Sequence, residues 1–265
     1  MNFKAMVIDM DGVLWHGDTP LPGLKTFFDY LEAKSLPFIL ATNNAMKIAA
    51  DYTQKLAGFG VKVAPEHILT SSEAAASYIK HSFPDEPSIY VMGESGLHRA
   101  IKAQGFEILS PEEVKAGAKA RIVVGGLMRQ ALNYDVLAMG SLLVQGGASF
   151  IATNYDSSFP SELGLLPGAG AVLSVVERSS GVSPTVIGKP NTIMFEEALR
   201  RLGTAAADTV MLGDRLNTDI EGGKKVGMQT ILVLSGVSSL EDVERSSLKP
   251  DYTFQDIAAL SKALA

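Results

Sequence analysis

Residues 5–12 read AMVIDMDG, a run of four apolar residues followed at once by two aspartates and a glycine. The run is continuous rather than alternating, which is typical of a strand buried on both faces of a parallel sheet. Similar short runs recur along the chain, and the stretches between them carry apolar residues at helical spacing, as at Leu24, Phe27, Phe28 and Leu31. This alternation predicts an α/β chain with a mainly parallel sheet.

The other expected strands share the same short, apolar character. Besides residues 5–8, the expected strands are residues 38–41, 89–92, 122–124, 150–152, 185–187, 209–212 and 230–234. Two stretches, 82–88 (SFPDEPS) and 179–184 (SSGVSP), have the composition of linkers. They bracket a segment with its own strands and helices, whereas the polar motifs described below lie outside it. We therefore expect a discontinuous core, residues 1–82 and 184–265, with an inserted α/β domain, residues 83–183.

Composition excludes several kinds of protein. Cysteine is absent, so there is no disulfide framework, no thiol nucleophile and no cysteine-ligated metal. The net charge of −6 and the isoelectric point near 5.3 argue against a nucleic-acid partner. No apolar run reaches the roughly 18 residues of a membrane span, and the first residues do not resemble a signal peptide. We expect a cytoplasmic protein with neither a nucleic-acid nor a membrane partner.

Four of the expected strands end in polar residues that a buried sheet does not need. These residues are Asp9, Asp11 and Gly12 after the first, Thr42, Asn43 and Asn44 after the second, Lys189 after the third, and Asp214, followed by Asp219, after the fourth. Ligands of open parallel sheets bind at the carboxyl ends of the strands. We therefore expect these side chains to converge, although they are far apart in the sequence.

The set predicts a site for phosphoryl transfer. The carboxylates of Asp9, Asp11 and Asp214 repel one another unless a hard divalent cation such as Mg²⁺ lies among them. Lys189 supplies a positive charge for phosphate oxygens, and a carboxylate can act as the nucleophile while a second one acts as general acid and base. Neutral side-chain donors and a backbone that can approach a phosphate closely complete the set: Thr42, Asn43 and Gly12.

In this order the four motifs resemble those of the haloacid dehalogenase (HAD) superfamily, in its phosphatase branch. They are DxDGVLW at 9–15, TNN at 42–44, KP at 189–190 and GDRxxxD at 213–219. The inserted domain is similar to the α/β (type IIA) cap of the 4-nitrophenylphosphatase, pyridoxal phosphatase and nucleotide phosphatase group. The similarity lies at residues 152–156, 160 and 167–170. Outside the inserted domain, residues 231–237 also match that group. The resemblance implies a Rossmann-like parallel-sheet core with an inserted smaller α/β cap.

The resemblance also implies a role for each matched residue. Asp9 is the nucleophile and a Mg²⁺ ligand, Asp11 is the general acid/base and binds the metal through its backbone carbonyl, and Asp214 is the third ligand. Gly12, Thr42, Asn43 and Lys189 hold the phosphoryl group, and Asp219 orients the metal shell or Lys189. The implied substrate is a small phosphomonoester of the nucleoside monophosphate, sugar phosphate or pyridoxal phosphate class, and a homodimer is common in the group.

Several alternatives stay open at this point. Asn154 and Asp156 either contact substrate or form an Asx turn, Asn44 caps a helix that begins near residue 45, and Asp219 either serves the site or favours a helix dipole. For the whole protein the alternatives are a signalling receiver domain, a dehalogenase proper and a ligand sensor without turnover. The chain is too long for a receiver domain, a dehalogenase does not need Asp11, and the intact set of charged residues argues against a sensor.

Overall fold

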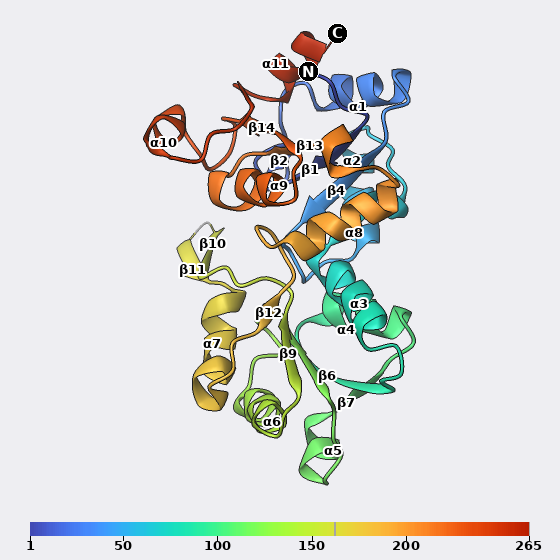
Figure 1. The fold of residues 1–265 in the computed structure, drawn as a ribbon, viewed down its shortest axis with the longest axis vertical. Coiled ribbons are helices and arrows are strands. Elements are labelled where there is room, and N and C mark those ends of the chain that lie inside the picture. Colours follow the sequence, from blue (N-terminus) through green and yellow to red (C-terminus); the bar gives the residue numbers. More distant parts are fainter. Residues whose placement is uncertain (162, 265) are drawn as a thin grey trace. The chain divides into compact units, whose positions relative to one another are not determined.

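The chain divides into two compact units in a computed structural model that describes residues 1–161 and 163–264 (Figure 1). Unit 1 comprises residues 1–42, 49–69 and the chain from 189 onward, whereas unit 2 comprises residues 43–48 and 70–188. The boundaries that we expected, after residues 82 and 183, therefore differ from the points at which the contacts change, after residues 69 and 188. Linker composition marks loops between elements, and these are not the points at which one unit gives way to the other.

The main sheet of unit 1 has the order β15-β14-β13-β1-β4-β5. Its strands are β15 (Tyr252–Phe254), β14 (Gln229–Val233), β13 (Thr209–Gly213), β1 (Ala5–Ile8), β4 (Phe38–Thr42) and β5 (Ile68–Thr70). β1 pairs in parallel with both β13 and β4, and all four of its residues are buried. The expectation of a strand covered on both faces at residues 5–8 is confirmed.

The remaining elements of unit 1 surround this sheet. The helices are α1 (Leu24–Ala33), α2 (Ala49–Gly58), α8 (Thr192–Leu202), α9 (Glu221–Lys225), α10 (Leu240–Arg245) and α11 (Ile257–Leu264), with short turns η1 (Pro65–His67), η2 (Ala206–Asp208) and η3 (Leu216–Ile220) and a small antiparallel pair, β2 (Trp15–His16) and β3 (Thr19–Pro20). α1 buries Leu24, Phe27, Phe28 and Leu31, as their helical spacing predicts. The burial of these four side chains fixes the face that α1 presents to the core.

Unit 2 has its own parallel sheet, of order β12-β9-β8-β6-β7. Its strands are β12 (Thr185–Val186), β9 (Ser149–Ala152), β8 (Ile122–Gly125), β6 (Ser88–Met92) and β7 (Glu107–Leu109). We expected residues 185–187 to share a sheet with the strand before Asp9, and this expectation is wrong, because β12 pairs with β9 at the edge of the unit 2 sheet. After β12, the chain enters unit 1 at residue 189.

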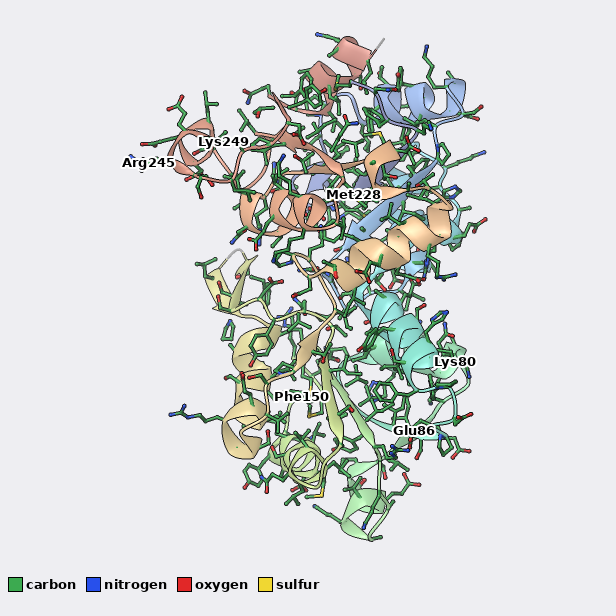
Figure 2. The ribbon with its side chains drawn as sticks, viewed as in Figure 1. Lys80, Glu86, Phe150, Met228, Arg245 and Lys249 are labelled. Atoms are coloured by element: carbon green, nitrogen blue, oxygen red, sulfur yellow. The ribbon has the colours of Figure 1, made fainter. Side chains whose placement is uncertain are left out.

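In the described part of unit 2, five helices and an antiparallel strand pair accompany the sheet. They are α3 (Ser71–Ser82), α4 (Ser95–Ala103), α5 (Pro111–Lys115), α6 (Tyr134–Gln145) and α7 (Ala169–Ser180), with the antiparallel strands β10 (Ser158–Ser161) and β11 (Gly164–Pro167). Phe150 lies in the apolar core that the unit 2 sheet shares with α6 and α7, whereas Arg245 and Lys249 extend outward from unit 1 (Figure 2). Each unit therefore has its own core.

A charge cluster on α8 fastens this helix to the sheet of unit 1. The Glu197 carboxylate accepts hydrogen bonds from Arg200 Nε (2.7 Å) and Arg201 Nε (2.9 Å), and Arg201 also donates to the backbone oxygen of Ile68 on β5 (3.1 Å). Burial raises the pKa of Glu197, but the hydrogen bonds from the two arginines outweigh it and hold the pKa below its usual value. The charged form of Glu197 is therefore the one that the fold stabilises.

We expect Glu197→Gln to lower the free energy of unfolding near neutral pH by about 1–2 kcal/mol. A depressed folded pKa gives stability that is present above the unfolded pKa, about 4.3, and is lost as the pH falls through the folded pKa. Urea unfolding of the wild type and the variant should therefore give curves that differ at neutral pH and converge below about pH 4. The exposed pair of Glu241 and Arg245 supplies the control, because Glu241→Gln should change little. A difference that stays constant with pH would contradict the role of the Glu197 charge.

Candidate active site

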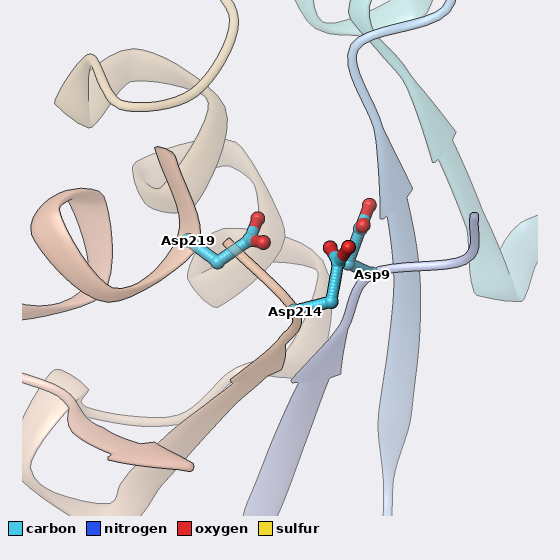
Figure 3. A group of neighbouring side chains, drawn as sticks. All are labelled: Asp9, Asp214 and Asp219. Atoms are coloured by element: carbon cyan, nitrogen blue, oxygen red, sulfur yellow. The ribbon is translucent and has the colours of Figure 1, made fainter. Parts of the chain in front are cut away.

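Three carboxylates meet at the carboxyl edge of the unit 1 sheet (Figure 3). Asp9 directly follows β1 and Asp214 directly follows β13, which are neighbouring parallel strands. Asp219 comes from η3, the single π-helical turn that follows. One oxygen of each carboxylate lies within 4.8 Å of the others, and Asp214 and Asp219 are only 3% and 1% exposed. The structure therefore brings together acids that are more than 200 positions apart in the sequence.

Lys189 provides the positive charge of this cluster. Its Nζ donates to Asp9 Oδ1 at 2.6 Å and to the Ala41 carbonyl at 3.2 Å, and it lies 2.7 Å from Asp219 Oδ1. Burial alone would lower the pKa of Lys189, but the carboxylates of Asp219 and Asp9 raise it above its ordinary value. Lys189 is therefore a buried ammonium held between two carboxylates.

The acids outnumber the cation, and their pKa values reflect this imbalance. Burial, together with the charges of Asp9 and Asp219, raises the pKa of Asp214 to about 7. Burial also raises the pKa of Asp219, although Lys189 opposes the rise. Close carboxylate oxygens with unbalanced negative charge are the donor set that a hard divalent cation such as Mg²⁺ prefers. The residues present thus fit a divalent metal.

Two glycines make room for the Asp214 carboxylate. Gly12 has a positive φ of 86°, and a Cβ on either Gly12 or Gly236 would overlap the carboxylate of Asp214. The backbone N–H of Val237 donates to Asp214 Oδ2 at 2.7 Å, and Ser235 Oγ donates to the Gly12 carbonyl at 2.8 Å. We expected Gly12 to lie beside a phosphate. The structure gives a second reason for glycine at this position, because a side chain there would overlap the Asp214 carboxylate.

The loop of residues 235–238 was not among the predicted site residues. It follows β14, the strand next to β13, so it too leaves the sheet at the carboxyl edge. A signal was present in the sequence, because Ser235 and Gly236 end an apolar run in the same way as the four motifs do. Residues 231–237 supported the family resemblance, but Ser235 and Gly236 were assigned no role at the site, because serine and glycine, unlike aspartate or lysine, are common in ordinary turns.

Asp11 lies apart from the three clustered carboxylates. Its side chain is exposed, and Oδ1 accepts a hydrogen bond of 2.8 Å from the indole Nε1 of Trp15. The tight turn between them is closed by a second bond, from the Gly12 N–H to the Trp15 carbonyl at 2.8 Å. The Asp11 carboxyl is thus held by an aromatic side chain rather than by the acid cluster.

Thr42 ends β4 and is 4% exposed, and its side chain interacts with the hydroxyl of Tyr52 on α2. Burial and the negative charge of Asp11 raise the pKa of Tyr52 above its ordinary value. The Tyr52 ring stacks on Trp15, with 6.4 Å between ring centroids and 17° between planes. Sequence reasoning did not find Tyr52, because an aromatic residue at helical spacing is normally a core residue.

The neighbouring asparagines behave differently from Thr42. Asn43 groups with unit 2, where its amide donates to Asp156 Oδ2 at 3.4 Å, and the Asn154 amide donates to the same oxygen at 2.7 Å. Asn44 Oδ1 accepts from the N–H of Met46 at 2.9 Å, and α2 begins only at Ala49. The expectation that Asn44 caps a helix from residue 45 is therefore wrong, because its side chain closes a local turn ahead of the helix.

Comparison with known proteins decides the family. Residues 6–107 match the family described as haloacid dehalogenase-like hydrolase, and residues 186–260 match a related HAD-hydrolase-like family. The sequence is 43% identical to an acid sugar phosphatase of Staphylococcus aureus over 97% of this chain and 96% of that protein. The chain belongs to the haloacid dehalogenase-like hydrolases. The phosphatase relatives place it in the phosphatase branch, as the four motifs led us to expect.

Solved structures of HAD phosphatases resemble this one over nearly their whole length. A p-nitrophenyl phosphatase from Archaeoglobus fulgidus has a TM-score of 0.91 and 31% identity, with 99% of this chain and 100% of that chain covered. NagD from E. coli K-12 has a TM-score of 0.88 and 32% identity, with 97% and 98% covered. The expected fold, a Rossmann-like core with an inserted cap, is confirmed. Among the described residues of this HAD phosphatase, no helix has both the length and the apolar character needed to cross a membrane.

Proposed function

We propose that this HAD phosphatase hydrolyses small phosphomonoesters of the sugar phosphate class, with Mg²⁺, through an aspartyl-phosphate on Asp9. The single observation that carries the proposal is the cluster of Asp9, Asp214 and Asp219 around a buried Lys189. The acid sugar phosphatase that is 43% identical over nearly the full chain favours sugar phosphates over the nucleoside monophosphate and pyridoxal phosphate classes.

Two displacements at phosphorus make up the reaction. An oxygen of Asp9 attacks the phosphorus, the bond from phosphorus to the ester oxygen breaks, and the leaving oxygen takes a proton from the Asp11 carboxylic acid. A water molecule then returns a proton to Asp11 and attacks the aspartyl-phosphate. The phosphorus bond to the Asp9 oxygen breaks, which releases inorganic phosphate and restores Asp9 as a carboxylate. The proton count of Asp11 is thereby restored as well.

Charge balance assigns the remaining groups. Mg²⁺, when bound by Asp9, Asp214 and the Asp11 carbonyl, would neutralise the negative charge of the phosphoryl group. The Lys189 ammonium holds Asp9 in one orientation at 2.6 Å and adds positive charge beside the reacting oxygens. Asp219 keeps Lys189 in place through their 2.7 Å contact. We propose that the hydroxyl of Thr42 donates a hydrogen bond to an oxygen of the phosphoryl group.

A substrate-selecting role for unit 2 is the remaining part of the proposal. Asp156 Oδ2 accepts from the amides of both Asn43 and Asn154, so three polar side chains meet at the end of β9. Such a cluster of donors and acceptors suits hydroxyl groups of a sugar. We propose that unit 2 is the cap, that Asn43 contacts the phosphoryl group, and that Asn154 and Asp156 contact the organic part of the substrate.

The proposal is tested by hydrolysis of 4-nitrophenyl phosphate and of a panel of sugar phosphates and nucleoside monophosphates. We expect kcat/KM to be highest for a sugar phosphate. Treatment with EDTA should lower the rate by about 100-fold or more, and added Mg²⁺ should restore it. A rate that survives EDTA would refute the metal, hydrolysis of nucleotides alone would refute the sugar class, and inactivity towards the whole panel would refute the proposed function.

A further inference from the structure

The proposed general acid/base is restrained by the only tryptophan of the chain. Trp15 Nε1 donates to Asp11 Oδ1 at 2.8 Å, and Trp15 is fully buried whereas Asp11 is exposed. An indole N–H is only a donor, so it selects an oxygen that acts as acceptor. In the protonated carboxyl this oxygen is the carbonyl, and the proton is then carried by the other oxygen, Oδ2. The hydrogen bond thus orients the Asp11 carboxyl by engaging Oδ1 rather than Oδ2.

Trp15 itself is held on several sides. Its ring stacks on Tyr52, and Phe59 packs against it with 6.1 Å between ring centroids. The ammonium of Lys55 lies 4.7 Å from the Trp15 ring centroid. A cation over an indole ring is attracted by the π electrons and draws electron density from the ring, which strengthens the N–H as a donor. The donor to Asp11 is therefore fixed in place and polarised.

The stacked pair of Trp15 and Tyr52 also contacts a residue that we propose binds the phosphoryl group. Tyr52, stacked on Trp15, interacts through its hydroxyl with Thr42 at the end of β4. Asp11, Trp15, Tyr52 and Thr42 thus form one continuous chain of contacts within unit 1. One pair of stacked rings therefore contacts both the proposed general acid/base, Asp11, and the proposed phosphoryl-binding residue, Thr42.

We propose that Trp15 is a positioning residue for general acid/base catalysis by Asp11. Its indole N–H holds Oδ1, so that Oδ2 gives its proton to the leaving oxygen as the phosphorus–oxygen bond breaks and takes a proton from water in the second step. This inference rests on the proposed function. It assigns to Trp15 a part in the reaction that a purely structural core residue would not have.

The leaving group distinguishes the two roles. A poor leaving group needs its proton early in the first displacement, whereas 4-nitrophenolate leaves with little help. Substituted phenyl phosphates, from 4-nitro to 4-methoxy, have almost the same size and differ mainly in the acidity of the phenol. A loss of packing at Trp15 would lower kcat/KM equally for all of them, but a misplaced Asp11 would lower it most for the poorest leaving groups.

Trp15→Phe keeps an aromatic ring and removes the N–H donor. We expect kcat/KM to fall by about tenfold or more for 4-methoxyphenyl phosphate and by less than about threefold for 4-nitrophenyl phosphate. In the Asp11→Ala background the Trp15→Phe change should add no further dependence on the leaving group, because the acid that it positions is gone. The control is Phe59→Leu, which loosens the packing of Trp15 and removes no hydrogen bond, so its effect should be the same for every ester.

A spectroscopic measurement tests the hydrogen bond without changing Trp15. Because Trp15 is the single tryptophan, the ultraviolet resonance Raman band that reports hydrogen bonding of the indole N–H arises from this residue alone. The band should shift toward a weaker hydrogen bond in Asp11→Ala and much less in Asp11→Asn, which keeps an acceptor oxygen. An unchanged band in Asp11→Ala, or an equal loss of kcat/KM for every ester in Trp15→Phe, would overturn the inference. Inactivity of the wild type towards every phosphate ester would instead overturn the proposed function, and the Raman shift would still report the contact.

Discussion

Asp9→Asn should lower the hydrolysis of 4-nitrophenyl phosphate by about 10⁴-fold or more while the protein stays folded. The asparagine amide is nearly the same size as the carboxylate but is not a nucleophile, so no aspartyl-phosphate can form. The fold should persist because Lys189 keeps its partner Asp219 at 2.7 Å, and because the repulsion between Asp9 and Asp214 is relieved. The measurement is the rate of nitrophenolate release with saturating Mg²⁺, beside a circular dichroism spectrum.

A matched control comes from the surface of the same unit. Asp29 on α1 forms an exposed pair with Lys25, so Asp29→Asn makes the same chemical change without touching the acid cluster, and its activity should equal that of the wild type. Wild-type turnover in Asp9→Asn, with an unchanged spectrum, would remove Asp9 as the nucleophile. Phosphate incorporation into the wild type but not the variant, measured after rapid acid quench, supplies an independent readout.

The second large effect concerns the buried cation. Lys189→Met fills a similar volume but leaves the carboxylates of Asp9 and Asp219 without their partner, in a place where Asp219 is 1% exposed. Breaking a buried ion pair from one side costs about 3–5 kcal/mol. We expect the free energy of unfolding in EDTA to fall by about this amount near neutral pH, and phosphate hydrolysis to fall by about 10³-fold or more.

The pH dependence of this variant has a definite sign. Lys189 opposes the rise in the pKa of Asp219, so without the cation the folded-state pKa of Asp219 lies further above its unfolded value, and the folded state binds more protons than the unfolded state. Stability then falls as the pH rises through this range, and Lys189→Met should recover much of its loss when the pH is lowered to about 5. Mg²⁺ at neutral pH should also restore part of it, because it replaces the missing positive charge.

Urea unfolding at both pH values, with EDTA and with Mg²⁺, measures these effects. The control is Lys224→Met, which removes the same charge from a partly exposed pair with Asp251 and should cost no more than about 1 kcal/mol at either pH. A loss in Lys189→Met that is equal at both pH values would show that packing, rather than charge, accounts for the stabilisation by Lys189.

The strands and the family were accessible from the sequence because they depend on local patterns. A continuous apolar run such as residues 5–8 can be buried on both faces only in a covered parallel sheet, and the structure places it at the centre of one. Motifs that end such runs are also local, and for this reason the HAD resemblance was visible at Asp9, Thr42 and Asp214. The two-residue strand β12 shows the limit, because so short a segment does not specify its sheet.

Individual side-chain contacts were not accessible, because they depend on where the side chains lie in three dimensions. The spacing of Asp11 and Trp15 in the sequence does not reveal that the indole N–H donates a hydrogen bond to the Asp11 carboxylate. The need for glycine at positions 12 and 236 becomes visible only once Asp214 occupies the space between them. Likewise, the sequence does not show that Thr42 belongs to unit 1 whereas its neighbour Asn43 belongs to unit 2.

By itself the sequence determined the α/β alternation, the four motifs and the acids that a phosphatase needs, since each is written in neighbouring residues. Only the tertiary structure decided that Asp219 and Asp9 share one lysine and that a tryptophan holds Asp11. The physical reason is that burial and hydrogen bonding act over a few ångströms in space. The carboxylate of Asp9 raises the pKa of Lys189, 180 positions away, only after the sheet has brought the two side chains together.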